Sequence, residues 1–352
     1  MRATRARLIL EDGTTFEGSC FGAESSSAGE VVFNTGMVGY PESITDPSYY
    51  GQILVLTYPS IGNYGVPDSN MCRADPVFES DKIRINGLVV SEYSVEYSHW
   101  QAGRSLSDWF ISENITGISG IDTRLLTRIL REKGTMLGKI VIDDDIEFYD
   151  PNGQNVISEV SLPDRSLTGK GSKRIAVLDC GCKNSIIGHL LRRNVEVLRL
   201  PWDSDLSTYD FDGLLVSNGP GNPKECIQPI QSVRYAINNN IPTMGICLGH
   251  QIIALAAGGD TYKLKYGHRS QNQPVKEVNS DKCIITSQNH GFAVNDDTIP
   301  EGWSPWFRNL NDGTNEGIIH ESGRFMSVQF HPEAAPGPED AEYIFDRFIE
   351  QL

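Results

Sequence analysis

The spacing of hydrophobic and polar residues divides the chain into two halves. In the first half, short apolar runs are separated by turns that contain Gly, Pro, Asn or Asp, which is typical of β-strands. Residues 8–11 and 14–20 lie on either side of Asp12-Gly13, and Asp-Gly is a dipeptide that type I′ hairpin turns favour. The pattern therefore predicts a β-hairpin at the start of a β-rich region.

Further strands and two helices are predicted in this half. The helix at about residues 105–111 is short, and the second helix runs from Asp122, a suitable N-cap, to Gly134. The strands are expected at residues 31–33, 53–57, 82–90 and 137–142.

The second half follows a polar segment, residues 150–172, that is rich in Gly, Ser, Pro and Asp. Beyond it, short apolar strands alternate with helices, which indicates a parallel sheet covered on both faces. Strands are expected at residues 175–179, 195–200, 213–217 and 241–246, helices at 185–193, 227–238 and 248–257, more strands within 263–329 and a last helix at about 339–351.

We therefore expect an α/β protein with two domains. The first, residues 1–149, is a β-rich α/β domain, and residues 150–172 are a linker. The second, residues 173–352, contains an open, mostly parallel sheet flanked by helices. A length of 352 residues suits two domains of about 100–200 residues each.

Composition narrows the function classes. The net charge of −16 argues against an extended nucleic-acid surface. Apolar runs fall short of the ~20 residues that a membrane span needs, and the N-terminus shows no signal-peptide pattern. Seven scattered cysteines suit a reducing compartment. We expect a cytoplasmic protein that binds neither nucleic acid nor membrane.

The strongest candidate for chemistry is the motif Gly-Ile-Cys-Leu-Gly at residues 245–249. It fits the pattern G-x-nucleophile-x-G, in which a sharp strand-to-helix turn exposes the central side chain, here Cys247. The start of the following helix favours a thiolate there. The alternative is a buried cysteine between a strand and a helix, with no catalytic role.

A thiol nucleophile needs a base and a group that orients the base. His331 follows a strand, and Glu333 would project on the same side because alternate residues of an extended segment share a face. The carboxylate could then fix the tautomer of the imidazole. A surface His–Glu pair without function is the alternative.

An acyl-transfer site also needs donors for an oxyanion. The loop Ser-Asn-Gly-Pro-Gly-Asn-Pro at residues 217–223 follows a strand and contains Gly219 and Gly221. Ligands bind at the carboxyl ends of strands in open α/β sheets, which favours this loop as a donor together with the N–H of Leu248. A simple tight turn is the alternative interpretation.

Other signals are weak. Cys180-Gly181-Cys182 lacks the partners of a tetrahedral metal site, and no metal site is expected. No Walker A phosphate loop is present, so the chain is not expected to hydrolyse ATP. His250 is expected to be structural, and residues 288–292 form a polar cluster that is either a turn or a substrate contact.

Taken together, these motifs resemble the class I, triad-type glutamine amidotransferases, whose Cys-His-Glu set falls on Cys247, His331 and Glu333. The resemblance extends over nearly the whole chain and is specifically to the small, glutaminase subunit of carbamoyl phosphate synthetase. The further segments that carry it are residues 29–40, 45–49, 56–59, 61–63, 120–124 and 288–294. Some relatives lose the cysteine, but this chain keeps it.

The resemblance implies a reaction and a partner. Cys247 would attack the side-chain amide of glutamine, and His331 would move the protons. Oxyanion and substrate contacts are implied at Ser48, Gly219, Gly221, Leu248, Gln251, Asn289, Gly291 and Phe292. Ammonia would pass to a large subunit that uses ATP, a divalent metal and bicarbonate, for arginine or pyrimidine synthesis; no cofactor is implied in this chain.

One segment departs from the family pattern. Relatives commonly have a glycine-rich stretch that ends in Asn-His-Pro-Val, where residues 267–275 of this chain read GHRSQNQPV. Three other functions stay open: a glutaminase that serves another synthetase, a catalytically silent regulatory partner, and a stand-alone cysteine peptidase or esterase.

Overall fold

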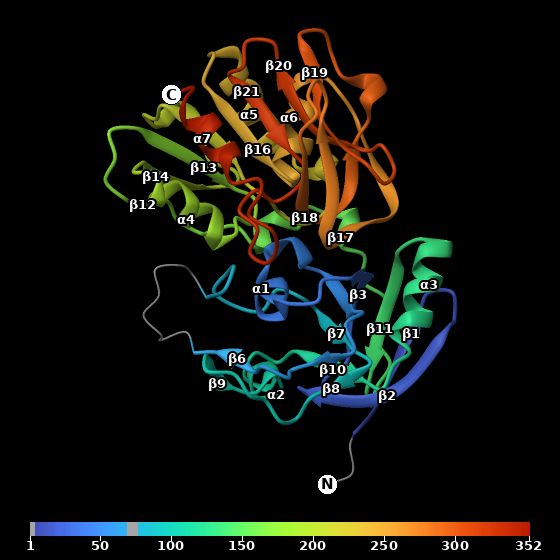
Figure 1. The fold of residues 1–352 in the computed structure, drawn as a ribbon. Helices are drawn as coiled ribbons and strands as arrows, with labels where there is room; N and C mark the ends of the chain where they lie inside the picture. Colours follow the sequence, from blue (N-terminus) through green and yellow to red (C-terminus); the bar gives the residue numbers. More distant parts are fainter. Residues whose placement is uncertain (1–3, 69–76) are drawn as a thin grey trace. The chain divides into compact units, whose positions relative to one another are not determined.

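The computed structural model describes residues 4–68 and 77–352 and divides the chain into two compact units, Met1–Pro151 and Asn152–Leu352 (Figure 1). The division falls inside the segment that we expected as a linker. From residue 152 on, that segment packs into the second unit: its strand β12 (Ser166–Thr168) joins the large sheet, and Ile157 is buried in the core.

The first unit is built on a closed seven-stranded barrel. Around the barrel the order is β1 (Arg5–Leu10), β11 (Met136–Val141), β3 (Ser27–Asn34), β4 (Gln52–Leu56), β7 (Gly87–Val89), β10 (Thr116–Ser119) and β2 (Thr15–Gly22). Strands β3, β4, β7 and β10 run parallel, and the other neighbours pair antiparallel.

The predicted hairpin is confirmed, because β1 and β2 pair antiparallel through a turn in which Gly13 has a φ of 87°. The two predicted helices are also present. In α3 (Thr123–Lys133), the N–H of Leu125 donates to the Asp122 carboxylate at 2.8 Å. The remaining elements are α1 (Tyr40–Thr45), α2 (Leu106–Ser112) and the short pairs β5 (Ser60–Ile61) with β8 (Glu92–Tyr93) and β6 (Val66–Pro67) with β9 (Ala102–Arg104).

The strand expected at residues 82–90 is wrong in its first half. Only Gly87–Val89 is a strand, although Ile83 and Ile85 are buried in the core of the unit. The N–H of Arg84 donates to the carbonyl of Ile44 in helix α1, and bonding to β4 begins only at Asn86, whose N–H donates to the carbonyl of Gln52 at 2.8 Å. The apolar side chains of this stretch come from core packing in a loop, which periodicity does not separate from a strand.

The second unit contains a mixed ten-stranded sheet. The order is β12, β14 (Glu196–Pro201), β13 (Arg174–Asp179), β15 (Gly213–Val216), β16 (Thr243–Ile246), β21 (Phe325–Val328), β20 (Asn315–His320), β19 (Trp303–Asn309), β17 (Thr261–Glu277) and β18 (Cys283–Val294). Strands β14, β13, β15, β16 and β21 form a parallel half, and the strands beyond β21 continue antiparallel.

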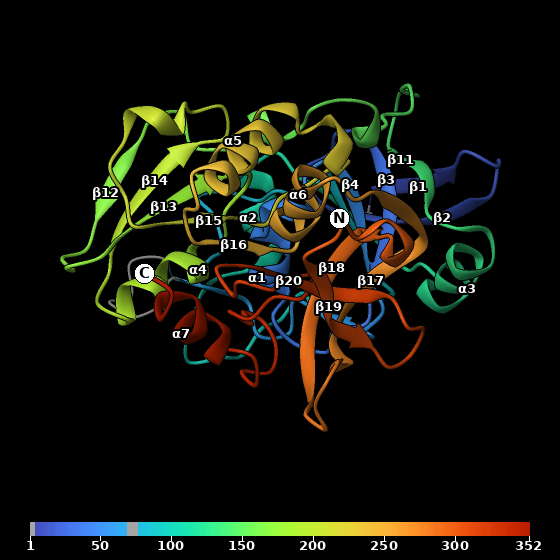
Figure 2. The ribbon, with the colours of Figure 1, turned by 90° about the horizontal axis from the view of Figure 1, so that it is seen from above.

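Helices cover both faces of this sheet, as Figure 2 shows. Helices α4 (Asn184–Arg192) and α7 (Tyr343–Ile349) pack on one apolar core, and α5 (Ile227–Asn238) and α6 (Leu248–Ala257) pack on the other. Helix α7 is shorter than the helix expected at residues 339–351. This three-layer arrangement leaves the carboxyl ends of the parallel strands at one edge, where ligands bind in open α/β sheets.

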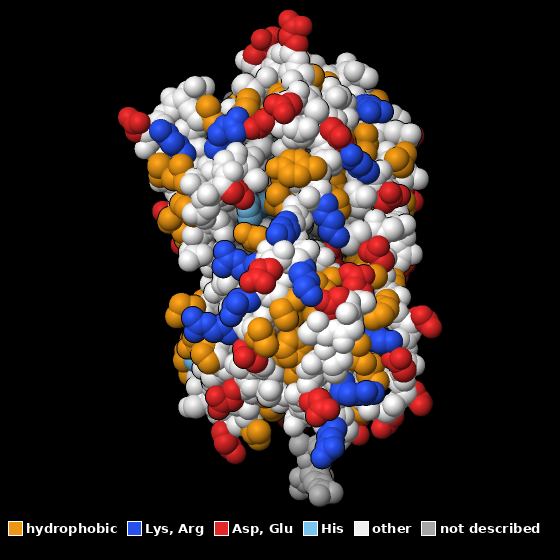
Figure 3. Space-filling view, turned by 90° about the vertical axis from the view of Figure 1, so that its right-hand side faces the viewer, with side chains coloured by type: hydrophobic (Ala, Val, Ile, Leu, Met, Phe, Trp, Pro, Cys, Tyr) orange, Lys and Arg blue, Asp and Glu red, His pale blue; other side chains and the backbone are white. Residues whose placement is uncertain are grey.

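Charged side chains of both signs are interspersed on the face that Figure 3 shows, with apolar side chains between them. Within the described residues, no helix has the length and apolar character that crossing a bilayer requires.

Candidate active site

Cys247 occupies a sharp turn between β16 and α6. Its φ of 54° and ψ of −102° lie outside the regions that residues with a side chain normally occupy. Such a conformation costs about 1–3 kcal/mol and persists only where the surrounding structure enforces it. Here the N–H of Cys247 donates to Val328 of β21 at 2.9 Å, and its carbonyl accepts from His250 at 3.1 Å.

The glycines on either side of the turn are required by close backbone packing. A Cβ on Gly245 would lie 2.4 Å from the carbonyl oxygen of Gly249, and a Cβ on Gly249 would lie 2.1 Å from that of Val216. Both approaches are too close for any side chain. The motif is therefore a steric requirement of the turn, and it brings the first residues of α6 against the end of β15.

His331 and Glu333 form a buried pair beside this turn. His331 Nδ1 lies 2.6 Å from Glu333 Oε1, and Cys247, His331 and Glu333 are each 2% exposed. The N–H of His331 donates to the carbonyl of Ser287 at 2.9 Å, which ties the segment after β21 to β18. Because the Glu333 carboxylate accepts from Nδ1, the imidazole presents Nε2 for proton transfer.

Electrostatics favour a charged imidazole. Burial opposes the charge, but the Glu333 carboxylate and the Cys247 side chain outweigh burial and raise the pKa of His331. Burial likewise opposes the charge of Glu333, but Lys183 and His331 lower the pKa of that carboxyl. An ionised carboxylate and an imidazolium are therefore stable at neutral pH although both are buried.

Lys183 is a site residue that our sequence reasoning missed. Its Nζ lies 3.0 Å from Glu333 Oε1 and donates to the carbonyl of Ala334 at 2.9 Å, and its side chain is only 3% exposed. Ala334 has a φ of 56°, so the ammonium holds a strained turn as well as the carboxylate. The available signal was position: Lys183 comes shortly after the carboxyl end of β13, at the same edge of the sheet as the turn.

The loop at residues 217–223 lies against the start of α6. A Cβ on Gly219 would lie 2.0 Å from the carbonyl oxygen of Cys180 and 2.9 Å from Leu248 Cδ2. Gly221 has a φ of 85°, which favours glycine. The structure thus brings Gly219 beside Leu248, whose N–H belongs to the first helical turn and has no acceptor within the helix.

The other predicted substrate-contact residues of the second unit lie on strand β18 or donate a hydrogen bond to it. The carbonyl oxygen of Asn289 lies 3.5 Å from Cys247 Sγ. Gln251 of α6 donates both N–H bonds of its amide internally, to Phe292 O at 2.9 Å and to Gln329 Oε1 at 3.0 Å, so it braces β18 beside the cysteine. Gly291 lies between these contacts on the same strand.

Two further residues, His250 and Ser48, make no side-chain contact with Cys247, His331 or Glu333 among the described hydrogen bonds. His250 is fully buried, its Nδ1 lies 2.9 Å from Ser327 Oγ, and burial lowers the pKa of His250 to about 3, as suits a neutral structural histidine. Ser48 belongs to the first unit, in a 3₁₀ turn whose N-cap Asp46 accepts from the Ser48 N–H at 2.9 Å. Its contact with glutamine stays a prediction that rests on the resemblance.

Comparison with known proteins assigns the family. Residues 8–140 match the carbamoyl-phosphate synthase small chain, CPSase domain, and residues 176–351 match the glutamine amidotransferase class-I family. The chain is 46% identical to the carbamoyl phosphate synthase arginine-specific small chain of Saccharomyces cerevisiae, over 99% of this chain and 89% of that protein. The chain belongs to the carbamoyl-phosphate synthase small-chain family.

Other relatives that the chain matches are much longer proteins. The chain is 48% identical to mitochondrial carbamoyl-phosphate synthase [ammonia] of Homo sapiens over 99% of its own length but spans only 24% of that protein. Among solved structures, a putative GMP synthase component from Thermoplasma acidophilum is 27% identical, covers 51% of this chain and 93% of its own, and has a TM-score of 0.46.

The raised pKa of His331 predicts how stability changes with pH. A group whose pKa rises on folding stabilises the folded state. For His331 this contribution is complete at a pH below 6.5, the pKa in the unfolded chain, and it is lost as the pH rises through about 10, the pKa in the folded protein. The free energy of unfolding of the second unit should therefore fall between these pH values, and fall less in His331→Gln. Urea denaturation at a series of pH values measures this free energy. An equal fall with pH in the unmodified protein and in His331→Gln would contradict the prediction.

The geometry also predicts unequal losses from the two partners of Cys247. His331→Ala removes the group that we expect to transfer protons and should lower kcat for glutamine hydrolysis by about 10²–10⁴-fold. Glu333→Ala removes only the group that orients and polarises the ring, so its kcat should fall less. Steady-state kinetics of both variants, with circular dichroism to check folding, would reveal the difference. Equal and complete losses would refute this division of roles.

Proposed function

We propose that the chain is the glutaminase subunit of a carbamoyl phosphate synthetase. The observation that carries the proposal is the buried set Cys247, His331 and Glu333, in which a strained turn holds the thiol beside an oriented imidazole. A conformation that costs free energy at a reactive residue is characteristic of functional sites. Family membership supports the same assignment.

In the proposed mechanism, the Cys247 thiolate attacks the amide carbon of glutamine. The N–H groups of Gly219 and Leu248 stabilise the negative oxygen of the tetrahedral intermediate. His331 then protonates the departing ammonia, which leaves a γ-glutamyl thioester. The same imidazole takes a proton from water, which attacks the thioester and releases glutamate. Glu333, held by Lys183, keeps the ring oriented through both steps.

Substrate specificity follows from the surroundings of the cysteine. We propose that Gly221, Asn289 and Gly291 present backbone groups to the glutamine, and that Ser48 binds its α-amino-acid end. Gln251 and Phe292 form the wall of the pocket, because the amide of Gln251 is already bonded to the Phe292 carbonyl. This arrangement makes Gln251 a brace of the pocket as much as a direct contact.

The ammonia needs a partner that consumes it. We propose a large subunit that binds ATP, a divalent metal and bicarbonate, since this chain has no Walker A phosphate loop of its own. The yeast relative is named as an arginine-specific small chain, which supports arginine synthesis as one destination and leaves pyrimidine synthesis open. The scattered cysteines support a cytoplasmic location. Co-purification from a native extract with a large ATP-binding chain tests the partnership.

Three alternatives make different predictions. The first alternative is a silent regulatory partner, which the name of the human relative, a carbamoyl-phosphate synthase [ammonia], brings to mind. Such a chain would bind a large subunit but would release no ammonia from glutamine. A peptidase or esterase would cleave peptide or ester substrates in preference to glutamine. A glutaminase of another synthetase would co-purify with a different partner. Release assays with all three substrates, together with the co-purification, separate these functions.

Replacing the proposed nucleophile should stop synthesis from glutamine but not synthesis from added ammonia. In the complex with its partner, Cys247→Ser should abolish glutamine-dependent synthesis, because a hydroxyl is a much weaker nucleophile than a thiolate. Synthesis from added ammonia should persist, since free ammonia bypasses the thiol. Both activities are measured on the same preparation. Glutamine-dependent turnover that survives the substitution would exclude Cys247 as the nucleophile.

Ser48 tests whether the first unit contributes to the glutamine site. A neutral hydrogen bond contributes about 0.5–1.5 kcal/mol, so Ser48→Ala should raise KM for glutamine by roughly 2- to 12-fold. Binding used equally in the ground and transition states leaves kcat almost unchanged. Synthesis from ammonia, measured in parallel, should not change. An unaltered KM in a folded, complexed variant would show that Ser48 does not bind glutamine.

A further inference from the structure

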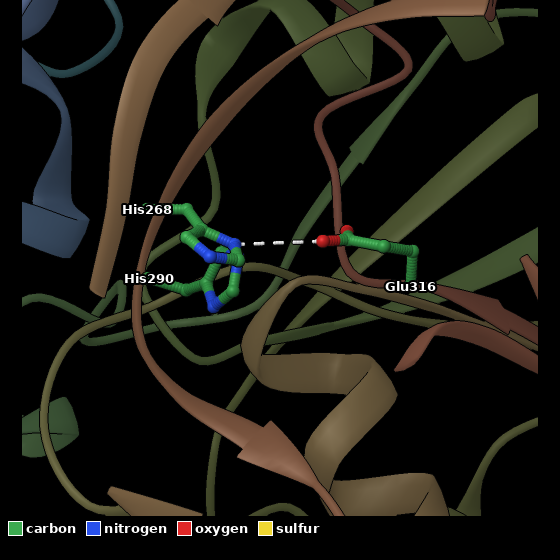
Figure 4. Close-up of side chains that lie close together, drawn as sticks. All are labelled: His268, His290 and Glu316. Atoms are coloured by element: carbon green, nitrogen blue, oxygen red, sulfur yellow. Dashed lines mark ion pairs between the residues drawn. The ribbon is translucent and has the colours of Figure 1, made fainter. Parts of the chain in front are cut away.

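Four polar side chains converge inside the antiparallel half of the second sheet. His268 comes from β17, Gln288 and His290 from β18, and Glu316 from β20; all four are less than 9% exposed. One ligand-type atom each from His268, His290 and Glu316 lies within 4.8 Å of the others. Figure 4 shows the two imidazole rings close together, with the Glu316 carboxylate directed at them.

The hydrogen-bond partners of His290 fix its tautomer. Its Nδ1 lies 2.8 Å from the backbone oxygen of Phe292. A carbonyl oxygen can only accept, so Nδ1 carries the hydrogen and Nε2 of the neutral ring presents a lone pair. That Nε2 lies 3.1 Å from Gln288 Oε1, which is also an acceptor.

His268 meets the same acceptor from the other side. Its Nε2 lies 2.8 Å from Asp312 Oδ2, so Nε2 carries a hydrogen. Its Nδ1 then points at Gln288 Oε1, 3.1 Å away, and at Glu316 Oε1, 3.5 Å away. The amide of Gln288 is oriented by its own N–H groups, which donate to Glu316 Oε2 at 2.9 Å and to Thr286 at 3.1 Å.

Four electron-rich atoms therefore face one another with no hydrogen assigned between them: His268 Nδ1, Gln288 Oε1, His290 Nε2 and Glu316 Oε1. Acceptors that face one another in a buried site are costly unless a hydrogen or a cation lies between them. Two ring nitrogens and one carboxylate oxygen are a set of three ligands that zinc takes in proteins, and the amide oxygen would occupy the fourth position.

We propose that His268, Gln288, His290 and Glu316 form a binding site for a zinc-class divalent ion. The outer contacts support it, because metal-bound histidines usually donate their second N–H to a carboxylate or a backbone carbonyl, as His268 does to Asp312 and His290 to Phe292. Glu316 is likewise held by the side chain of Asn309, whose Nδ2 donates to Oε1 at 3.0 Å.

The location gives such an ion a structural role. It would join β17, β18 and β20 on both sides of Asn289, whose carbonyl lies 3.5 Å from the Cys247 thiol. The site goes beyond the proposed glutaminase function and does not depend on it. It also departs from our expectation of no metal site, which rested on sequence spacing, because the ligands come from strands that are brought together only by the fold.

A proton is the competing source of positive charge. Burial opposes a charged ring, but Asp312 and Glu316 together raise the pKa of His268 to about 9. A proton on His268 would satisfy its own contacts but leave His290 Nε2 facing Gln288 Oε1. Zinc could also bind the Cys247 thiol and His331, so the experiment must remove that thiol.

The test uses the full chain with Cys247→Ser. The protein is treated with a chelator, incubated with zinc sulfate and passed through a gel-filtration column. Its zinc content is then measured by inductively coupled plasma mass spectrometry. We expect one zinc per chain and a raised melting temperature. His268→Phe and Glu316→Gln in the same background should lose the zinc. His320→Phe is the matched control, since His320 lies at the end of β20 outside the cluster, and should keep it.

Two further measurements keep the proposal testable if a ligand variant misfolds. Asp312→Asn leaves all four ligands in place and should weaken zinc affinity by about 10–100-fold, as outer-contact substitutions do. A cobalt-substituted sample should show visible absorption typical of nitrogen and oxygen ligands, without a thiolate charge-transfer band. Absence of bound zinc in Cys247→Ser, equal zinc in His268→Phe and His320→Phe, or a thiolate band would overturn the proposal.

Discussion

The site depends on one residue with a side chain being held at positive φ between a buried strand and a helix. Cys247 adopts this conformation because the backbone around it leaves no other path: Gly249 packs against Val216 and Gly245 packs against Gly249 at distances that exclude a Cβ. The same packing places the start of α6, with its unbonded N–H groups, beside the loop of Gly219. One steric constraint thus brings together the proposed nucleophile and the proposed oxyanion donors.

A second constraint is charge balance in a buried site. His331 and Glu333 are both buried, and each isolated charge would be costly there. Lys183 resolves this, because its ammonium lies 3.0 Å from the carboxylate and lowers the pKa of Glu333. The functional unit is therefore better described as four side chains than as three, with Lys183 acting through Glu333.

The sequence predicted the parts of this site that follow from local rules. The glycine spacing around Cys247 follows from the close packing of the turn, and the His-x-Glu spacing places two side chains on one face of an extended segment. Both features could therefore be predicted without a structure. Lys183 and the cluster around Glu316 were not predicted, because their partners lie far away in sequence. Likewise, Ile83 and Ile85 are apolar for reasons of core packing, and the local pattern assigned them to a strand that forms only at Gly87–Val89.

Trapping the covalent intermediate shows which residue attacks glutamine. The chain is mixed with glutamine, quenched in acid within a turnover, digested and analysed by mass spectrometry. If Cys247 is the nucleophile, the peptide that contains it should carry a γ-glutamyl adduct that hydroxylamine removes and that is diminished in His331→Ala. An adduct on another residue, or glutamine turnover with unmodified Cys247 under conditions that preserve thioesters, would contradict that assignment.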